Sequence, residues 1–188
     1  MRLNTLLAQK KNTIVKKWFA SAIETYPSDT AKFLKSQKDP FANPVGRTIY
    51  QGLEALFDEL LEEVDHETMR SLLDPIIRIR AVQNFSPSQA TSFIFFLKDV
   101  IRNTIIKEGF QTQFFSELLL FESKIDELGL IAFNLYMQCR EKIYELKANE
   151  MKNRTFRAFE RAGLVREMPA DTPDLDNINI CKEASNDQ

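Results

Sequence analysis

The chain has 188 residues, of which 44% are hydrophobic, with only 5 glycines against 15 phenylalanines. This composition supports one domain with a packed core and leaves too few turn glycines for an all-β fold, so we expect an all-α protein. The net charge is -2, and residues 1–165 carry only a small positive surplus, 23 basic minus 21 acidic side chains, which argues against a dedicated nucleic-acid binder.

Two helices are predicted at the start of the chain. The first runs from about Asn4 to Glu24, with lysines on its polar face, and Tyr26-Pro27 ends it. A short second helix from Ser28 to Leu34 is followed by a polar loop. The apolar face of the first helix is expected to consist of Leu6, Leu7, Ile14, Trp18 and Ala22.

Cap residues followed by proline mark the next helix starts. Asn43-Pro44 places an N-cap before proline at the first helical position and predicts a strong helix that continues to about Val64. Asp65 is expected to cap the next turn, and Asp74-Pro75 repeats the cap-then-proline pattern. The chain is therefore predicted to bend at Pro75 while it stays helical to Val82.

The clearest helix start is the stretch from Ser86 to Gln89. Ser86 and Gln89 have the spacing of a capping box, and Pro87 occupies the first helical position. The apolar periodic run that follows is expected to end at Gly109, because glycine adopts the left-handed conformation that closes many helices.

The longest periodic stretch runs from Phe114 to Arg161 with only Gly129 to interrupt it, and a helix of that length would measure about 70 Å. Spacings of three and four residues are typical of helices that pair along one face. The predicted apolar stripe is Leu118, Phe121, Ile125, Leu128, Ala132, Leu135 and Cys139, continued by Ile143 and Leu146. The far end of this helix must be solvated or paired with another chain. If it is paired, we expect a homodimer whose interface includes Leu135, Cys139, Ile143 and Leu146.

Ala162-Gly163 is expected to end the long helix. Residues 1–165 are predicted to form one helical bundle with a linker-like helix at about 114–161. Residues 166–188, with two basic and six acidic side chains, are predicted to be a flexible acidic tail. Cys139 and Cys181 form no CxxC pair, and no apolar run approaches 18 residues, so we expect a cytoplasmic protein without membrane insertion.

Arg78 and Arg80 alternate with isoleucines in an apolar stretch, and on a helix they point about 200° apart. One of them is therefore expected to be buried, where a guanidinium needs a carboxylate or several carbonyls. Two interpretations stay open. One is an internal ion pair, and the other is a site in which Arg80 and Gln83 receive an anionic signal molecule or a partner's carboxylate.

Three other kinds of residue are candidate functional groups. Cys139 is either a small apolar member of the core or a thiol that senses oxidants or bridges two chains. His66 lies between two acidic residues at a helix start and is expected to face water without a ligand role. Six phenylalanines either fill the core or line a small apolar pocket, with Phe93 as its ligand-binding member: Phe93, Phe95, Phe96, Phe114, Phe115 and Phe121. No metal site, cofactor or nucleophile–base pair is predicted, so no enzymatic activity is expected.

Three stretches, taken in order, resemble a known family. They are IRIRAVQNFSPSQA at 77–90, FIFFLK at 93–98 and YMQCREKIYELK at 136–147. Over roughly Leu3 to Arg154 the chain resembles the N-terminal domain of RsbRD-type proteins, the RsbT co-antagonists of bacterial stress signalling. None of these motifs is catalytic, so the resemblance depends on the series as a whole.

The resemblance implies a helical sensory domain, related in role to the haem-free, globin-like domains of stressosome proteins. Such domains dimerise and pass a signal along a C-terminal linker helix, which in full-length relatives leads into a STAS output domain. Here an acidic stretch follows instead. The first functional hypothesis is a regulatory module that engages a protein partner through residues 140–161, which carry seven basic and four acidic side chains.

The second hypothesis is a small-ligand or cofactor carrier that serves a redox complex. It would use a phenylalanine-lined pocket with Arg80 or Cys139. The resemblance adds that stand-alone members of the family are associated with sulfate-reducing bacteria, near genes for the membrane complex that serves sulfite reduction, which implies an accessory role.

Overall fold

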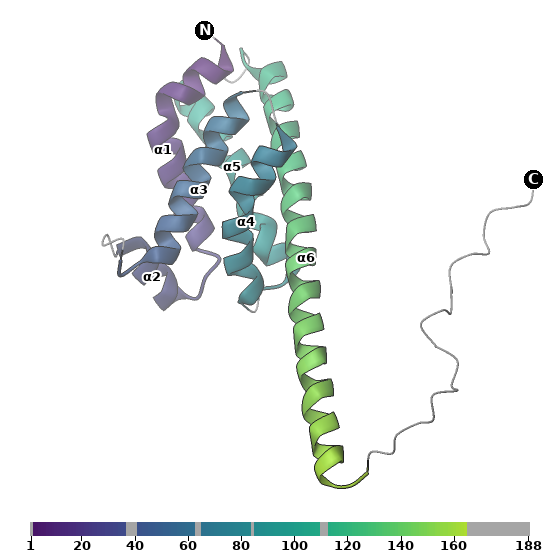
Figure 1. Ribbon diagram of the computed structural model, residues 1–188. Coiled ribbons are helices and arrows are strands. Elements are labelled where there is room, and N and C mark those ends of the chain that lie inside the picture. Colours follow the sequence, from purple (N-terminus) through teal and green to yellow (C-terminus); the bar gives the residue numbers. More distant parts are fainter. Residues whose placement is uncertain (1, 37–40, 63–64, 84, 110–112, 165–188) are drawn as a thin grey trace, which may run out of the picture. The chain divides into compact units, whose positions relative to one another are not determined.

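The computed structural model describes residues 2–36, 41–62, 65–83, 85–109 and 113–164. In this part of the chain there are six helices and no strand, which confirms the all-α prediction. They are α1 (Leu3–Ile23), α2 (Ser28–Ser36), α3 (Pro44–Leu61), α4 (His66–Val82), α5 (Pro87–Lys107) and α6 (Phe115–Arg161) (Figure 1). The chain divides into two compact units, residues 1–145 and 146–188, which are described separately.

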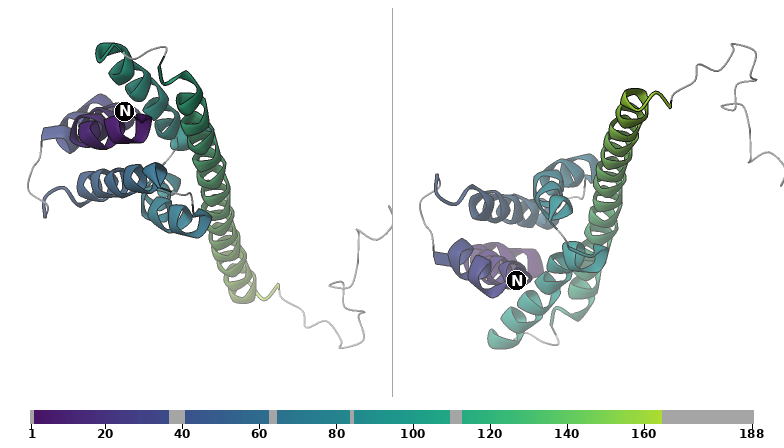
Figure 2. Two further views of the ribbon diagram at one scale, coloured as in Figure 1. Left: turned by 90° about the horizontal axis from the view of Figure 1, so that it is seen from above. Right: turned by 90° about the horizontal axis from the view of Figure 1, so that it is seen from below.

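The first unit is a helical bundle around one hydrophobic core. In Figure 2, α1 lies beside α3, while α6 flanks α4 and α5. Trp18 of α1 is fully buried, and its indole Nε1 donates a hydrogen bond of 2.7 Å to the carbonyl oxygen of Phe93 in α5. Because a buried indole N–H needs an acceptor, this bond fixes how α1 packs on α5.

The predicted caps account for the starts of α3 and α5. The Asn43 side chain accepts the backbone N–H of Gly46 at 2.8 Å, and Pro44 follows it as the first helical residue. At α5, both hydrogen bonds of the Ser86–Gln89 capping box are present, with Pro87 in the first turn. These local signals mark both helix starts as the sequence predicted.

The predicted cap at Asp74 is wrong, because Asp74 and Pro75 lie inside a single helix, α4, which begins after the Asp65 cap. The Asp74 carboxylate instead accepts a hydrogen bond from Arg78 one turn later. Pro75 removes one N–H from the helical ladder. The helix continues to Val82, as predicted, since its apolar face on both sides of the proline is buried in the core.

The long helix α6 passes Gly129 without a break. It begins at Phe115, one residue after the start of the periodic stretch at Phe114. Gly129 is buried, and a Cβ at this position would lie 2.5 Å from Cζ of Phe95 in α5. Glycine therefore serves close packing between two helices here. The predicted end is confirmed, because Gly163 has φ +66° and follows the last turn.

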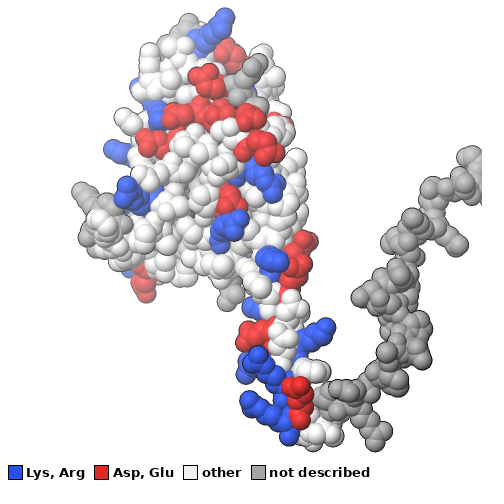
Figure 3. Space-filling view, viewed as in Figure 1, with Lys and Arg blue, Asp and Glu red and all other residues white. Residues whose placement is uncertain are grey.

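Most of the predicted apolar stripe of α6 packs into the core of the first unit. Its buried members are Phe121, Ile125, Leu128, Ala132 and Leu135. In the second unit, every described residue from Leu146 to Leu164 is exposed. Lys and Arg side chains gather along this last part of α6 (Figure 3), where residues 146–161 include five basic and two acidic side chains. The predicted acidic tail lies outside the described residues, and none of the described helices is long and apolar enough to cross a membrane.

Candidate functional site

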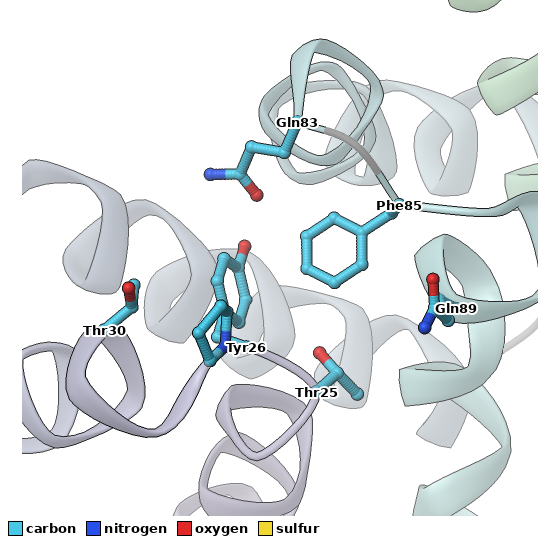
Figure 4. A pocket seen from close by; sticks show the side chains of 7 residues that line it. Thr25, Tyr26, Thr30, Gln83, Phe85 and Gln89 are labelled. Atoms are coloured by element: carbon cyan, nitrogen blue, oxygen red, sulfur yellow. The ribbon is translucent and has the colours of Figure 1, made fainter.

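A pocket of about 580 Å³ lies where the end of α1, the start of α2, and the connection from α4 to α5 meet. This volume is in the range of small-molecule sites. The pocket combines aromatic rings with hydroxyl and amide groups (Figure 4). Its described lining consists of Thr25, Tyr26, Pro27, Thr30, Gln83, Phe85 and Gln89.

Arg80 is buried against the aromatic wall of this pocket. Its guanidinium carbon lies 5.2 Å from the ring centroids of both Tyr26 and Phe85, and 4.6 Å from that of Phe93. Arg80 is 0% exposed, whereas Arg78 is exposed, which confirms that one of the two arginines is drawn inward. The faces of aromatic rings attract a cation, so the three rings stabilise the buried charge in part.

The hydrogen bonds of Arg80 tie three parts of the bundle together. Its Nη2 donates to the carbonyl of Ala22 at 3.0 Å and to the Thr25 hydroxyl at 3.1 Å, at the end of α1. Its Nη1 donates to the carbonyl of Gln89 in α5 at 3.2 Å. No carboxylate is among the partners that the described residues provide, so carbonyl and hydroxyl oxygens, and not an internal ion pair, hold the guanidinium.

The charge of Arg80 is therefore only partly compensated. Burial lowers the pKa of Arg80, because desolvation disfavours its charged form. Burial raises the pKa of Tyr26, while the nearby Arg80 charge acts in the opposite direction. At the same place, three buried polar atoms have no hydrogen-bond partner among the described residues: Tyr26 Oη, Arg80 Nε and Gln83 Oε1.

The structure brings some of the predicted ligand-binding residues together and separates others. Gln83 lines the pocket, Arg80 lies behind its rings, and Phe93 supplies one of the rings around Arg80 without lining the pocket. Cys139 is elsewhere, half-buried on α6 near Arg78. Tyr26 and Phe85 were missed, since each lies just outside a helix where no periodic pattern marks the buried side.

The surroundings of Cys139 make it a poor nucleophile. Burial raises the pKa of its thiol, and this outweighs the lowering effect of the nearby Arg78 charge. A raised pKa leaves little thiolate at neutral pH, and the thiolate is the reactive form. Cys181 lies outside the described residues.

His66 is 62% exposed, and its Nε2 lies 2.6 Å from a carboxylate oxygen of Glu127 in α6. This surface contact agrees with the expected position of His66 at the start of a helix, facing water. Among the described residues there is no group of three or more His, Cys, Asp or Glu side chains that could hold a metal ion.

Two hydrogen bonds join α6 to the segment that walls the pocket. The Tyr136 hydroxyl donates to the carbonyl oxygen of Phe85 at 2.6 Å, and Arg140 Nη1 donates to the carbonyl oxygen of Ala81 at 3.0 Å. Phe85 itself lines the pocket. Phe85, between α4 and α5, therefore lines the pocket and also binds α6 through its carbonyl oxygen, while Arg140 holds the last turn of α4 close to Gln83.

The four residues predicted to form a dimer interface have different environments. Leu135 is 3% exposed and belongs to the core of the first unit. Cys139 and Ile143 are half-buried against that core, and Leu146 is 60% exposed. As the chain folds here, Leu146 is the member of the set that is most available to a partner.

The comparison with known proteins gives one result. A family model described as the RsbT co-antagonist protein RsbRD N-terminal domain matches residues 12–151. The match spans the pocket, Arg80 and the two hydrogen bonds from α6, and it extends past the boundary between the two units. No curated protein and no solved structure matches the chain. Since the matched segment is well over half of the 188 residues, the chain belongs to the family of RsbRD N-terminal domains.

Proposed function

We propose that this protein is a non-catalytic sensory or regulatory domain whose output element is α6. Its family consists of regulatory sensor domains and is not a known enzyme family. One observation carries the proposal. Through Tyr136 and Arg140, α6 holds the connection that walls the pocket, and the same helix continues unbroken to Arg161.

This arrangement suggests how a signal reaches the output. A ligand that displaces Phe85 shifts the carbonyl oxygen that Tyr136 binds, and one that displaces Gln83 acts two residues from Ala81, whose carbonyl oxygen Arg140 binds. A helix is stiff along its axis, so a change in how Tyr136 and Arg140 are anchored shifts or rotates α6 as a whole. The signal is thus a change in the position of a helix, without a chemical reaction.

The exposed end of α6 suits an acidic protein partner. Ala148, Met151, Thr155 and Ala158 recur at spacings of three and four residues and make an apolar stripe on the helix. Lys147, Lys152 and Arg154 flank this stripe. Like charges along the flanks disfavour pairing with a second copy of the same helix, whereas an acidic surface on another protein would complement them.

A photo-crosslinking amino acid placed at position 151 or 153 tests this output surface in the host cell. The two positions are about 200° apart on the helix, so they face opposite sides. We expect an adduct with a protein that presents an acidic surface from position 151, and a much weaker one from the matched position 153. Equal adducts from both positions, or none from position 151, would contradict an output through this face.

We further propose that the protein is a homodimer and that the second copy covers the outward face of α6 in the first unit. Leu130 and Phe133 are 68% and 44% exposed on this face, and Phe95 of α5, which packs on Gly129, is 41% exposed. Neighbouring charges are mixed, with Asp126 paired to Lys98 of α5 at 2.6 Å. A mixed surface does not repel its own copy, unlike the basic end of the helix.

Sedimentation velocity with matched substitutions tests the dimer. Leu130 and Leu146 have similar exposures, 68% and 60%, but they lie about 160° apart around α6. Leu130→Asp is expected to weaken dimerisation at least tenfold, because a desolvated carboxylate at an apolar interface costs more than 1.4 kcal/mol. Leu146→Asp is expected to leave the dimer intact. The reverse result would place the interface on the stripe predicted from the sequence, and a monomeric wild-type protein would refute the dimer.

The alternative role as a redox carrier gains no support from Cys139, since burial raises the pKa of its thiol and keeps it protonated. The pocket is compatible with a small-ligand role, but that role is the input of the proposed sensor and requires no separate function.

A further inference from the structure

The pocket beside Arg80 contains more hydrogen-bonding capacity than the protein itself uses. Tyr26 lines the pocket and is 94% buried, and its hydroxyl has no partner among the described residues. The carbonyl oxygen of the Gln83 side chain is also buried without a partner. Figure 4 shows the Gln83 amide and the Tyr26 hydroxyl pointing into the same part of the pocket. Buried polar groups are nearly always paired, so these two groups call for a hydrogen-bonding partner that the described residues do not supply.

The electrostatics of the pocket favour a negative charge. Arg80 is fully buried behind the rings of Tyr26 and Phe85, and its Nε has no acceptor among the described residues. The described lining contains no Asp, Glu, Lys or Arg. Because a buried charge is screened far less than an exposed one, the field of Arg80 reaches the pocket and is not cancelled by a lining carboxylate.

The donors fit a single carboxylate better than a phosphate. A phosphate carries up to two negative charges and is usually bound by several cationic or backbone donors. Here one guanidinium lies behind the aromatic wall, and the groups that reach the pocket itself are hydroxyls and amides. A monoanion with two oxygens matches the Tyr26 hydroxyl and the amide N–H of Gln83, whose oxygen and nitrogen can exchange places by rotation of the amide.

The remaining walls call for an apolar body on the ligand. The Tyr26 and Phe85 rings meet edge to face, with centroids 5.1 Å apart, and Pro27 completes this apolar side. The volume of about 580 Å³ is far larger than a bare carboxylate requires. A flat or branched hydrocarbon body would cover the rings and remove their surface from water.

We propose that the pocket between the α1–α2 corner and the α4–α5 connection binds a small organic monocarboxylate with an apolar body, whose carboxylate is held by Tyr26 and Gln83 in the field of Arg80. This inference deepens the proposed function by naming the class of input signal. It relies on that function only for the consequence of binding. Binding itself depends on the pocket alone.

Three probes test the proposal: benzoate, its neutral amide benzamide, which has the same planar shape, and the cation benzamidinium, which is also planar. Each is titrated into the 188-residue chain and followed by amide NMR shifts. A ligand of this size is expected to bind with a Kd on the order of 1 mM. We expect benzoate to bind at least tenfold more tightly than benzamide, with the largest shifts around Tyr26, Gln83 and Phe85, and benzamidinium to give no saturable shifts.

Tyr26→Phe is the decisive variant, because it removes a hydroxyl that has no partner among the described residues and should not disturb folding. We expect benzoate affinity to fall at least tenfold while the melting temperature stays the same or rises. Tyr50→Phe is the matched control, since Tyr50 packs edge to face on Phe19 and does not belong to the described pocket lining. It should bind benzoate as the wild type does.

Three outcomes would overturn the proposal: equal affinity for the acid and its amide, unchanged benzoate affinity in Tyr26→Phe, or no benzoate shifts at about ten times the expected Kd. A different outcome would contradict the proposed sensor function without affecting the binding site. If benzoate binds as expected but leaves the amide signals of Tyr136, Arg140 and the following residues of α6 unchanged, the binding site stands and its coupling to α6 does not.

Discussion

Replacing Arg80 with alanine is expected to lower the free energy of unfolding by about 3–5 kcal/mol, since the change leaves a large cavity and removes a buried hydrogen-bonded group. The guanidinium fills the space between the rings of Tyr26, Phe85 and Phe93. It also bonds Ala22 and Thr25 at the end of α1 to α4, and Gln89 of α5 to α4. Urea unfolding followed by circular dichroism measures the loss.

Arg80→Met separates the volume of this side chain from its charge. Methionine is shorter than arginine but has a similar volume, and replacing a poorly compensated buried ion with an apolar side chain of similar volume is often close to neutral. The carbonyl of Ala22 keeps the Thr25 hydroxyl as a donor, and that of Gln89 keeps the Ser92 hydroxyl. We therefore expect Arg80→Met to cost less than about 1.5 kcal/mol. Equal losses for methionine and alanine would show that the hydrogen bonds, and not the filled volume, dominate.

Arg80→Met also tests whether the charge of Arg80 contributes to ligand binding in the pocket. If Arg80→Met folds as expected, it retains the pocket and its aromatic walls but has lost the positive field. Its affinity for benzoate should then fall at least tenfold, while its affinity for benzamide should change little. An unchanged preference for the acid would mean that Arg80 serves folding alone and that other groups bind the anion.

Gly129→Val is expected to destabilise the protein by about 2 kcal/mol, because a larger side chain must be forced into a well-packed contact. A Cβ at Gly129 would lie 2.5 Å from Cζ and 3.1 Å from Cε1 of Phe95. Since Phe95 is 41% exposed, its ring can turn outward, but the two γ-methyl groups of valine leave less room for it to settle than a single methyl would. Chemical unfolding of the single variant measures the cost.

A double-mutant cycle with Phe95→Ala identifies the source of this cost. In the Phe95→Ala background the clash is gone, so Gly129→Val should become close to neutral. Gly129→Ala should then even stabilise the helix by up to about 1 kcal/mol, because alanine favours the helical conformation more than glycine does. If Gly129→Val costs as much without the Phe95 ring as with it, the penalty arises within α6 and the explanation by close packing is wrong.

The local signals in the sequence predicted most of the helix boundaries correctly. Asn43-Pro44, the Ser86–Gln89 capping box and Gly163 each act over a few neighbouring residues, and each functions in the structure as its sequence suggested. Asp74-Pro75 carries the same signal, yet it lies within α4. A cap-then-proline pair is permitted at a helix start but does not require one, and burial of the flanking apolar residues decided the outcome.

The candidate site could be predicted only in part. The alternation of Arg78 and Arg80 in an apolar segment indicated that one guanidinium would be buried, and Gln83 was named with Arg80. Which arginine turns inward depends on Ala22 and Thr25, 58 and 55 residues earlier in the chain. Tyr26 and Phe85 could not be identified, because a residue between helices has no periodic pattern to show which way it faces.

By itself, the sequence determined that the chain is helical, where most helices begin and end, and that one face of the last helix is apolar, since caps and the 3.6-residue period act within a few turns. Only the tertiary structure decided that this face packs into its own bundle, that Gly129 makes room for Phe95, and that a buried cation lies behind an open pocket. The physical reason is that a periodic pattern specifies which side of a helix avoids water, but not which distant segment covers it. That choice depends on how all the helices fit together in one core.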